Sequence, residues 1–135
     1  YEYKIINREA DLSLARNKAW HVKKKINIKL LKKGARLFEG THDFSTFRST
    51  SCSAKSPIKK MKTVKVKSNG EKISIIFKSE SFLQNQVRSM VGCLKYLSCG
   101  SWTLDKFKTA FKSKKRSQCA PPAPAHGLYL KNVLY

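Results

Sequence analysis

The hydrophobic pattern is clearest in residues 81–100, SFLQNQVRSMVGCLKYLSCG. Six apolar residues in this segment recur at the spacing of one helical face: Leu83, Val87, Met90, Val91, Leu94 and Leu97. Such spacing is typical of an amphipathic helix whose apolar stripe packs on a core. We therefore predict a central helix over this segment.

Arg88 lies outside that apolar stripe. At about 100° per residue, its side chain points roughly 125° away from the centre of the stripe, with Gly92 one turn later. Glycine costs a helix about 1 kcal/mol relative to alanine, so Gly92 suggests that another backbone or a ligand passes close to the helix. The ordinary alternative is a solvated arginine beside a tolerated glycine, and spacing alone favours that alternative.

Two further helices are predicted from their cap residues. Asn27 can cap a helix that runs through Phe38, and Ser101 or Thr103 can cap a shorter helix through about Lys112. In both segments the apolar residues recur at helical spacing. The central helix therefore has two amphipathic neighbours to pack with.

The segment GTHDFSTFR predicts a short helical turn capped by Thr41, with Phe44 and Phe47 on one side. His42 and Asp43 are adjacent in it and resemble a catalytic dyad. Neighbours on a helix point in different directions, however, and no nucleophile is identified for them to activate. A packed phenylalanine pair with polar capping groups is the favoured interpretation.

Alternating apolar and polar residues predict strands at both ends of the chain and a hairpin in its middle. The first strand places Tyr1, Tyr3 and Ile5 on one face. The dipeptide Asn69-Gly70 predicts a type I′ turn between the two hairpin strands. The predicted strands cover residues 1–7, 58–68, 73–77 and 128–135.

This order of elements predicts an α+β fold, in which an antiparallel sheet of about four strands has helices packed on one face. The other face of the sheet would be open. Aromatic side chains such as Tyr1 and Tyr3 on an open face would suit nucleic acid, as in other sheet-based RNA binders. Residues 119–126 contain three prolines, which exclude a helix there and predict a stiff surface loop.

The charge of the chain indicates a polyanionic partner. Its 135 residues, sufficient for one domain over residues 1–135, include 29 Lys and Arg against 8 Asp and Glu, a formal charge of +21. A lysine-biased proteome is the alternative cause of part of this excess. The lysines of the hairpin either face RNA or guard the strand edges, and guarding is their ordinary role. The lysines are spread over the whole chain, which disfavours a membrane-surface protein.

Other function classes find little support. No run of 18 apolar residues and no signal-peptide pattern is present, so neither a membrane span nor secretion is indicated. The four cysteines form no C-x-x-C pair and the three histidines lie far apart, so we expect free thiols in a reducing cytoplasm and no metal site. The chain opens at Tyr1 in strand-like sequence, which suggests a fragment of a longer polypeptide.

Four ordered blocks carry a resemblance to a known family: GTHDFSTFR, CSAKSPIKK, FLQNQVRSMVG and GLYLKNVLY. In this order and separation they resemble the C-terminal half of the TruA family of tRNA pseudouridine synthases, over nearly the whole chain. One departure is that the family usually has a His-Met pair where this chain has Asn85 and Gln86.

The resemblance implies half of an enzyme that isomerises uridine to pseudouridine in the anticodon arm of tRNA, at positions 38 to 40. Such enzymes need no metal or organic cofactor, and they are homodimers whose subunits each combine two similar half-sheets. They flip the target base, break its bond to C1′, rotate the uracil and rejoin it through C5. We therefore expect a cytoplasmic protein that binds tRNA.

The resemblance also implies roles for individual residues. Tyr1 falls on the tyrosine that stacks on the flipped base and helps to move the C5 proton. Arg88 falls on the arginine that pairs with the catalytic aspartate, and Leu128 on the apolar residue that packs against the base. Arg48, at the end of GTHDFSTFR, is expected to bind substrate.

The catalytic aspartate itself belongs to the family's N-terminal half and is absent from this chain. Asp11, Asp43 and Asp105 do not sit in an Arg-Thr-Asp type motif, so none of them receives that role. We therefore expect the chain alone to be inactive. A stand-alone, non-catalytic basic RNA-binding module is the alternative, favoured only if this chain is a whole gene product.

Overall fold

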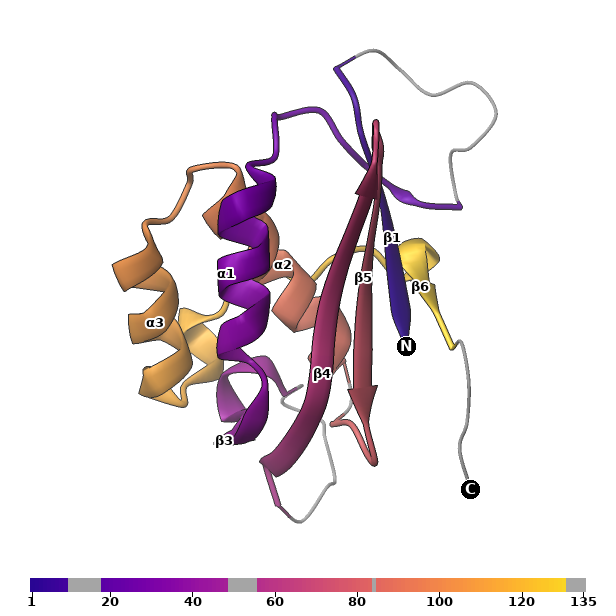
Figure 1. Cartoon of the computed structure of the whole chain (residues 1–135). Helices are drawn as coiled ribbons and strands as arrows, with labels where there is room; N and C mark the ends of the chain where they lie inside the picture. Colours follow the sequence, from indigo (N-terminus) through magenta and orange to yellow (C-terminus); the bar gives the residue numbers. More distant parts are fainter. Residues whose placement is uncertain (10–17, 49–55, 84, 131–135) are drawn as a thin grey trace.

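The structure is a computed structural model that describes residues 1–9, 18–48, 56–83 and 85–130 (Figure 1). Within these ranges six strands form one sheet in the order β2-β1-β5-β4-β3, and β6 pairs with β1. The strands are β1 (Glu2–Asn7), β2 (Trp20–Val22), β3 (Gly40–Asp43), β4 (Ile58–Asn69), β5 (Lys72–Ser79) and β6 (Leu128–Tyr129). The predicted α+β class is confirmed, with two short strands, β2 and β6, beside the four longer ones.

The sheet is antiparallel except for one pair. β1 and β2 run parallel, with Ile5 opposite Trp20, and this short edge strand comes from a segment that the hydrophobic pattern left unassigned. Residues 131–135 of the predicted last strand lie outside the described residues. Of the predicted strand, β6 covers the first two positions, antiparallel to the start of β1, and the described Leu130 is not part of it.

The central hairpin is confirmed, but its turn is one residue later than predicted. Asn69 pairs with Lys72, so Gly70 and Glu71 form the two-residue turn. Within the hairpin turn only Gly70 has a positive φ, of 62°. A positive φ confined to the first central residue is the pattern of a type II′ turn, so the predicted type I′ is wrong.

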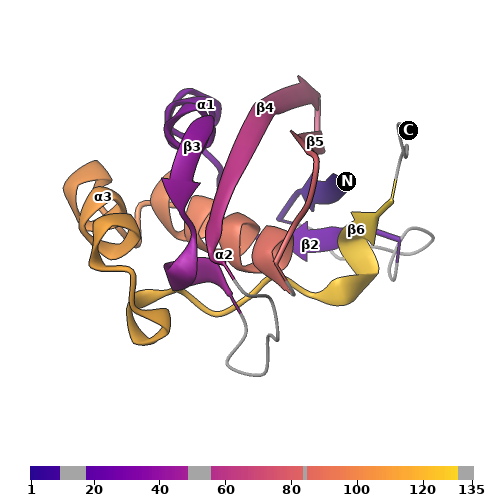
Figure 2. The same ribbon diagram turned by 90° about the horizontal axis from the view of Figure 1, so that it is seen from below.

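Three helices lie on one side of the sheet (Figures 1 and 2). They are α1 (Ile28–Leu37), α2 (Gln86–Ser98) and α3 (Leu104–Ser113), and single 3₁₀ turns cover Ser45–Phe47, Arg116–Gln118 and Ala125–Gly127. Asn27 caps α1 by accepting a hydrogen bond from the Leu30 amide at 3.2 Å, and Thr103 caps α3 in the same way. None of these helices is long and apolar enough to cross a membrane.

The apolar stripe predicted for the central helix forms the middle of the core. All six of its residues are buried, together with Tyr3, Ile75 and Phe77 from the sheet. The helix is shorter than the predicted segment 81–100, because it begins at Gln86 after the left-handed Asn85, and Leu83 therefore precedes it. α1 packs against both α2 and β4, and α3 packs outside them against α1 and α2. α2, which carries Arg88 on its first turn, therefore packs between the other two helices and the buried side chains of the sheet.

Three local predictions are wrong. Thr41 does not cap a helical turn, because residues 40–43 form β3 and Thr41 lies opposite Lys60 of β4. Tyr3 is fully buried on the helix-covered face, so it is no platform on the open face for nucleic acid. The proline-rich segment is not a surface loop throughout, because Ala120 and Ala123 in it are buried against the core.

Candidate active site

Arg88 is joined by two hydrogen bonds to the segment that follows α3. Its Nε donates to the carbonyl oxygen of Ala123 at 2.7 Å, and the Ala123 amide donates to the Arg88 carbonyl at 2.9 Å. Nη1 lies 3.5 Å from Oδ1 of Asn85, a long contact, and within the described residues Nη2 makes no hydrogen bond. The side chain is half-buried. The guanidinium of Arg88 is therefore anchored through Nε, and its remaining donors are available on the half-exposed side.

Gly92 explains how this segment approaches so closely. A Cβ atom at this position would lie 2.1 Å from the carbonyl oxygen of Pro121. The close approach inferred from the sequence is confirmed, and the neighbour is the backbone of residues 121–122. Only glycine lets α2 and this segment pack together, and their packing places Ala123 against Arg88.

Tyr3 fixes the other side of the same segment. Its hydroxyl donates to the Pro124 carbonyl at 2.5 Å. A Cβ atom at Gly127 would lie 2.7 Å from the Tyr3 ring, so this glycine also permits a close contact. Burial raises the pKa of the Tyr3 hydroxyl well above its ordinary value, and the positive charge of Arg88 partly opposes that rise. Tyr3 therefore stays a neutral donor that orients residues 124–127.

Tyr1 and Leu128 lie on either side of Tyr3. The Tyr1 amino group donates to the Phe77 carbonyl at 3.0 Å, and its ring meets Phe82 edge-on with centroids 5.1 Å apart. Leu128 opens β6 and pairs with Tyr3 across the sheet. Both side chains are only partly buried and pack against the core. The structure thus brings Tyr1, Leu128 and Arg88 around one residue, Tyr3.

Arg48 is attached to the opposite edge of the sheet. It follows the 3₁₀ turn Ser45–Phe47 at the end of β3, and β5 and β4 separate β3 from β1. Its charge acts on Asp43. Burial favours a higher pKa for that carboxyl, but hydrogen bonds from Ser45 and the charges of Lys114 and Arg48 outweigh burial, so the pKa of Asp43 is lowered. The structure therefore does not group Arg48 with the residues around Tyr3.

Two of the remaining polar candidates, Asp43 and His42, have structural partners. Asp43 accepts hydrogen bonds from the Ser45 amide and hydroxyl at 2.9 and 2.6 Å, and Asp105 is an exposed residue in the first turn of α3. Asp11 lies outside the described residues. His42 bonds the Glu39 carbonyl at 2.7 Å. The described residues contain no group of three His, Cys, Asp or Glu side chains that fits a metal ion.

Three of the four cysteines are free thiols, as expected, and Cys52 lies outside the described residues. The sulfurs of Cys93 and Cys119 are 3.5 Å apart. Donation from Cys93 to Cys119 raises the pKa of Cys93 and lowers that of Cys119. This contact adds another link between α2 and the segment that holds Arg88.

Sequence reasoning missed Tyr3 and Asn85 as supports of Arg88. The alternation in the first strand already put Tyr3 on the same face as Ile5. Isoleucine is usually buried, so a tyrosine on the same face of the strand is expected to be buried as well. This was the signal for Tyr3 that the sequence offered. Asn85 precedes α2 with a positive φ of 61°, and no pattern in the sequence predicts its contact with Arg88.

Comparison with known proteins identifies the family of the chain. A sequence model of the tRNA pseudouridine synthase family matches residues 35–135. Over its whole length the chain is 58% identical to tRNA pseudouridine synthase A of Pelagibacter ubique, of which it covers 55%. It is 45% identical to the protein of that name from Parvibaculum lavamentivorans, covering 55% of it, and 44% identical to one from a Caulobacter species, covering 54%.

The chain therefore spans about half the length of the curated relatives it matches. The family model covers the blocks around Arg88 and Leu128. The similarity to the relatives covers the whole chain and so includes the first strand. The chain belongs to the tRNA pseudouridine synthase family.

Proposed function

We propose that the whole protein isomerises uridine to pseudouridine in the anticodon arm of tRNA, at positions 38 to 40. The observation that carries this proposal is the held guanidinium of Arg88, whose Nε is fixed on Ala123 while Nη2 has no partner among the described residues. The relatives bear the name of tRNA pseudouridine synthase A. A fixed cation with unused donors suits a carboxylate that must stay ionised.

The reaction exchanges one bond of the uracil for another. The N1–C1′ bond breaks, C5 bonds to C1′, the proton on C5 leaves and N1 gains a proton. The aspartate that initiates this exchange comes from the half of the protein outside this chain. In this proposal Arg88 holds that carboxylate in position and in its charged form, because an opposite charge lowers a carboxyl pKa.

Tyr1 and Leu128 supply the walls for the flipped base. A base removed from its stack needs an aromatic partner and an apolar surface, and both side chains are only partly covered. In this proposal Tyr1 also helps to move the C5 proton. Arg48, on the other edge of the sheet, would contact the tRNA away from the reacting base.

The whole protein is proposed to be a cytoplasmic homodimer, with tRNA spanning both subunits and with no metal or organic cofactor. Each active site would then need residues from both halves of a subunit. This chain supplies the arginine and the base-stacking residues. The other half supplies the catalytic carboxylate.

Mapping pseudouridine in tRNA tests the proposed positions. Unmodified tRNA carrying uridine at 38, 39 or 40 is incubated with the whole protein, and pseudouridine is located by carbodiimide adducts that stop reverse transcription. We expect stops at these positions and none in tRNA with cytidine there. Stops confined to another arm would contradict the anticodon assignment while leaving the family intact.

A further inference from the structure

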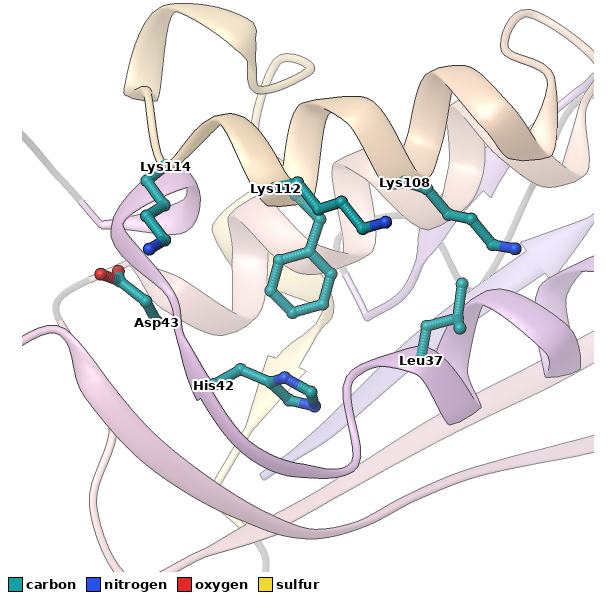
Figure 3. A pocket seen from close by; sticks show the side chains of 7 residues that line it. Leu37, His42, Asp43, Lys108, Lys112 and Lys114 are labelled. Carbon is teal, nitrogen blue, oxygen red and sulfur yellow. The ribbon is translucent and has the colours of Figure 1, made fainter.

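A basic hollow lies away from the residues around Tyr3, between the end of α1, β3 and α3 (Figure 3). Its volume is about 370 Å³. Lysines extend over it from α3 on one side, and His42 and Asp43 reach it from β3 on the other. The residues that line it are Leu37, His42, Asp43, Lys108, Phe111, Lys112 and Lys114.

The charge of this hollow favours an anion. Lys108 and Lys112 are exposed and four residues apart, so they share one face of α3. Lys114 points toward Asp43 in Figure 3, and its charge contributes to the lowered pKa of that carboxyl. Asp43 already accepts two hydrogen bonds from Ser45. Lys108 and Lys112 are thus left to bind an external anion.

The lining between these charges is flat and apolar. Phe111 is partly exposed, stacks on Phe44 with ring centroids 5.6 Å apart, and meets the His42 ring edge-on at 5.3 Å. The hydrogen bond from His42 Nε2 to the Glu39 carbonyl, 2.7 Å long, holds the imidazole in place. The aromatic surface is therefore rigid before any ligand arrives.

Lys114 has an unusual backbone for its residue type. It ends α3 with φ at 58° and ψ at 21°, the left-handed conformation that glycine normally supplies at this position. Lys114 therefore brings a positive charge to the rim of the hollow in a backbone conformation that is strained for any residue with a Cβ atom. This observation is independent of the shape of the hollow.

We infer that this hollow binds one nucleotide of an RNA strand, with its phosphate on Lys108 and Lys112 and its base or ribose on Phe111 and His42. Lysines neutralise phosphates, and aromatic rings stack on bases of any sequence. The inference rests on the proposed function, since it takes tRNA as the partner. It adds a second RNA contact near β3, which lies at the other end of the strand order from β1, the strand that Tyr1 precedes.

Paired substitutions separate this site from the general charge of the chain. Lys108→Gln with Lys112→Gln removes two charges from the hollow. Lys29→Gln with Lys33→Gln is the matched control, because these lysines are also exposed and four residues apart, on α1. The affinity of the whole protein for tRNA is measured as a function of salt concentration for both pairs.

The slope of log affinity against log salt counts the phosphates that the protein neutralises. We expect the pair from the hollow to reduce this slope by about 1 to 2, and the control pair to leave it unchanged within error. Equal slopes for both pairs and the wild type would overturn the inference. Equal reductions by both pairs would also overturn it, because the loss would then follow net charge alone.

A third variant guards against a folding artefact. Lys114→Gly places glycine at a backbone conformation that suits it, so the melting temperature should stay equal or rise. The affinity for tRNA should fall, because the negative charge of Asp43 then faces the phosphate without the opposing charge of Lys114. Unchanged affinity in this variant would contradict a role for the rim. A polyglutamate competitor that displaces tRNA as well as a short RNA does would indicate an acidic protein partner and overturn the choice of RNA. These binding measurements do not depend on isomerisation. The RNA site at the hollow and the proposed isomerase function can therefore be refuted independently of each other.

Discussion

Replacing Arg88 with alanine in the whole protein is expected to lower the single-turnover rate of isomerisation by about 100-fold or more. In the proposed function the change removes the cation that holds the catalytic carboxylate, so the carboxyl pKa would rise and its position would loosen. Among the described residues the one short side-chain hydrogen bond that is lost is that to Ala123, so the free energy of unfolding should fall by about 1 kcal/mol. The tRNA affinity should change little. Rapid-quench kinetics and thermal melting measure the two effects.

Arg88→Lys provides the conservative comparison. Lysine keeps the charge but has a single amine in place of the planar guanidinium, so it cannot bond Ala123 through one nitrogen and a carboxylate through the others. Its rate should therefore fall between those of the wild type and the alanine variant. A wild-type rate in the alanine variant would refute the active-site role. A large stability loss in both variants would instead show that Arg88 mainly holds the segment around Ala123.

Gly92→Ala is expected to destabilise the chain by about 1–3 kcal/mol, although alanine is the better helix former by about 1 kcal/mol. The reason is that the new Cβ would lie 2.1 Å from the Pro121 carbonyl oxygen, which is backbone and cannot swing away. Residues 121–123 must then move from α2, which breaks the hydrogen bonds between Ala123 and Arg88. Isomerisation by the whole protein should fall with them. Chemical denaturation measures the stability loss.

Gly100→Ala is the matched control for this substitution. Gly100 follows the same helix, and no atom lies within 4 Å of its added Cβ, so only the strain of its positive φ of 84° remains. Amide hydrogen exchange then separates the two variants. The Ala123 amide should lose protection in Gly92→Ala and keep it in Gly100→Ala. Retained protection at Ala123 in the first variant would contradict the packing argument.

Local signals in the sequence determined most of the fold. The caps at Asn27 and Thr103, the stripe of α2 and the hairpin near Gly70 all depend on neighbours within a few residues, and each is found in the structure. The exact turn was missed because Asn69-Gly70 and Gly70-Glu71 both contain the glycine, and strand register decides between them. That register is set by cross-strand pairs rather than by the dipeptide.

The errors arose where a contact joins distant parts of the chain. Alternation shows that Tyr1 and Tyr3 share a face but does not say which face the helices cover, so the buried position of Tyr3 was missed. Thr41 fits a cap in isolation, yet β4 offers its backbone a strand partner. The proline-rich segment has no periodic pattern, so neither the burial of Ala120 and Ala123 nor the close contact with Gly92 could be assigned to it from the sequence.

In the candidate site, too, a local signal led to a correct prediction, whereas contacts between distant parts of the chain were missed. Gly92 predicted a close neighbour from its place on the helix, and the structure identifies that neighbour as the backbone at Pro121. The roles of Tyr1, Arg88, Leu128 and Arg48 came from the resemblance to a family, and they stay predictions. No local pattern links Arg88 to Ala123, since 35 positions separate them. The hollow beside Lys108 likewise joins three separate segments and has no sequence motif.

Release of tritium from tRNA labelled at C5 of uridine tests the central claim most directly, because C5 loses its proton only when it bonds to C1′. The whole protein and the isolated 135-residue chain are compared on the same labelled tRNA. We expect the whole protein to release tritium over many turnovers and the isolated chain to release none, since the proposal assigns the catalytic carboxylate to the other half. Release by the isolated chain, or tRNA binding without release by the whole protein, would contradict this account.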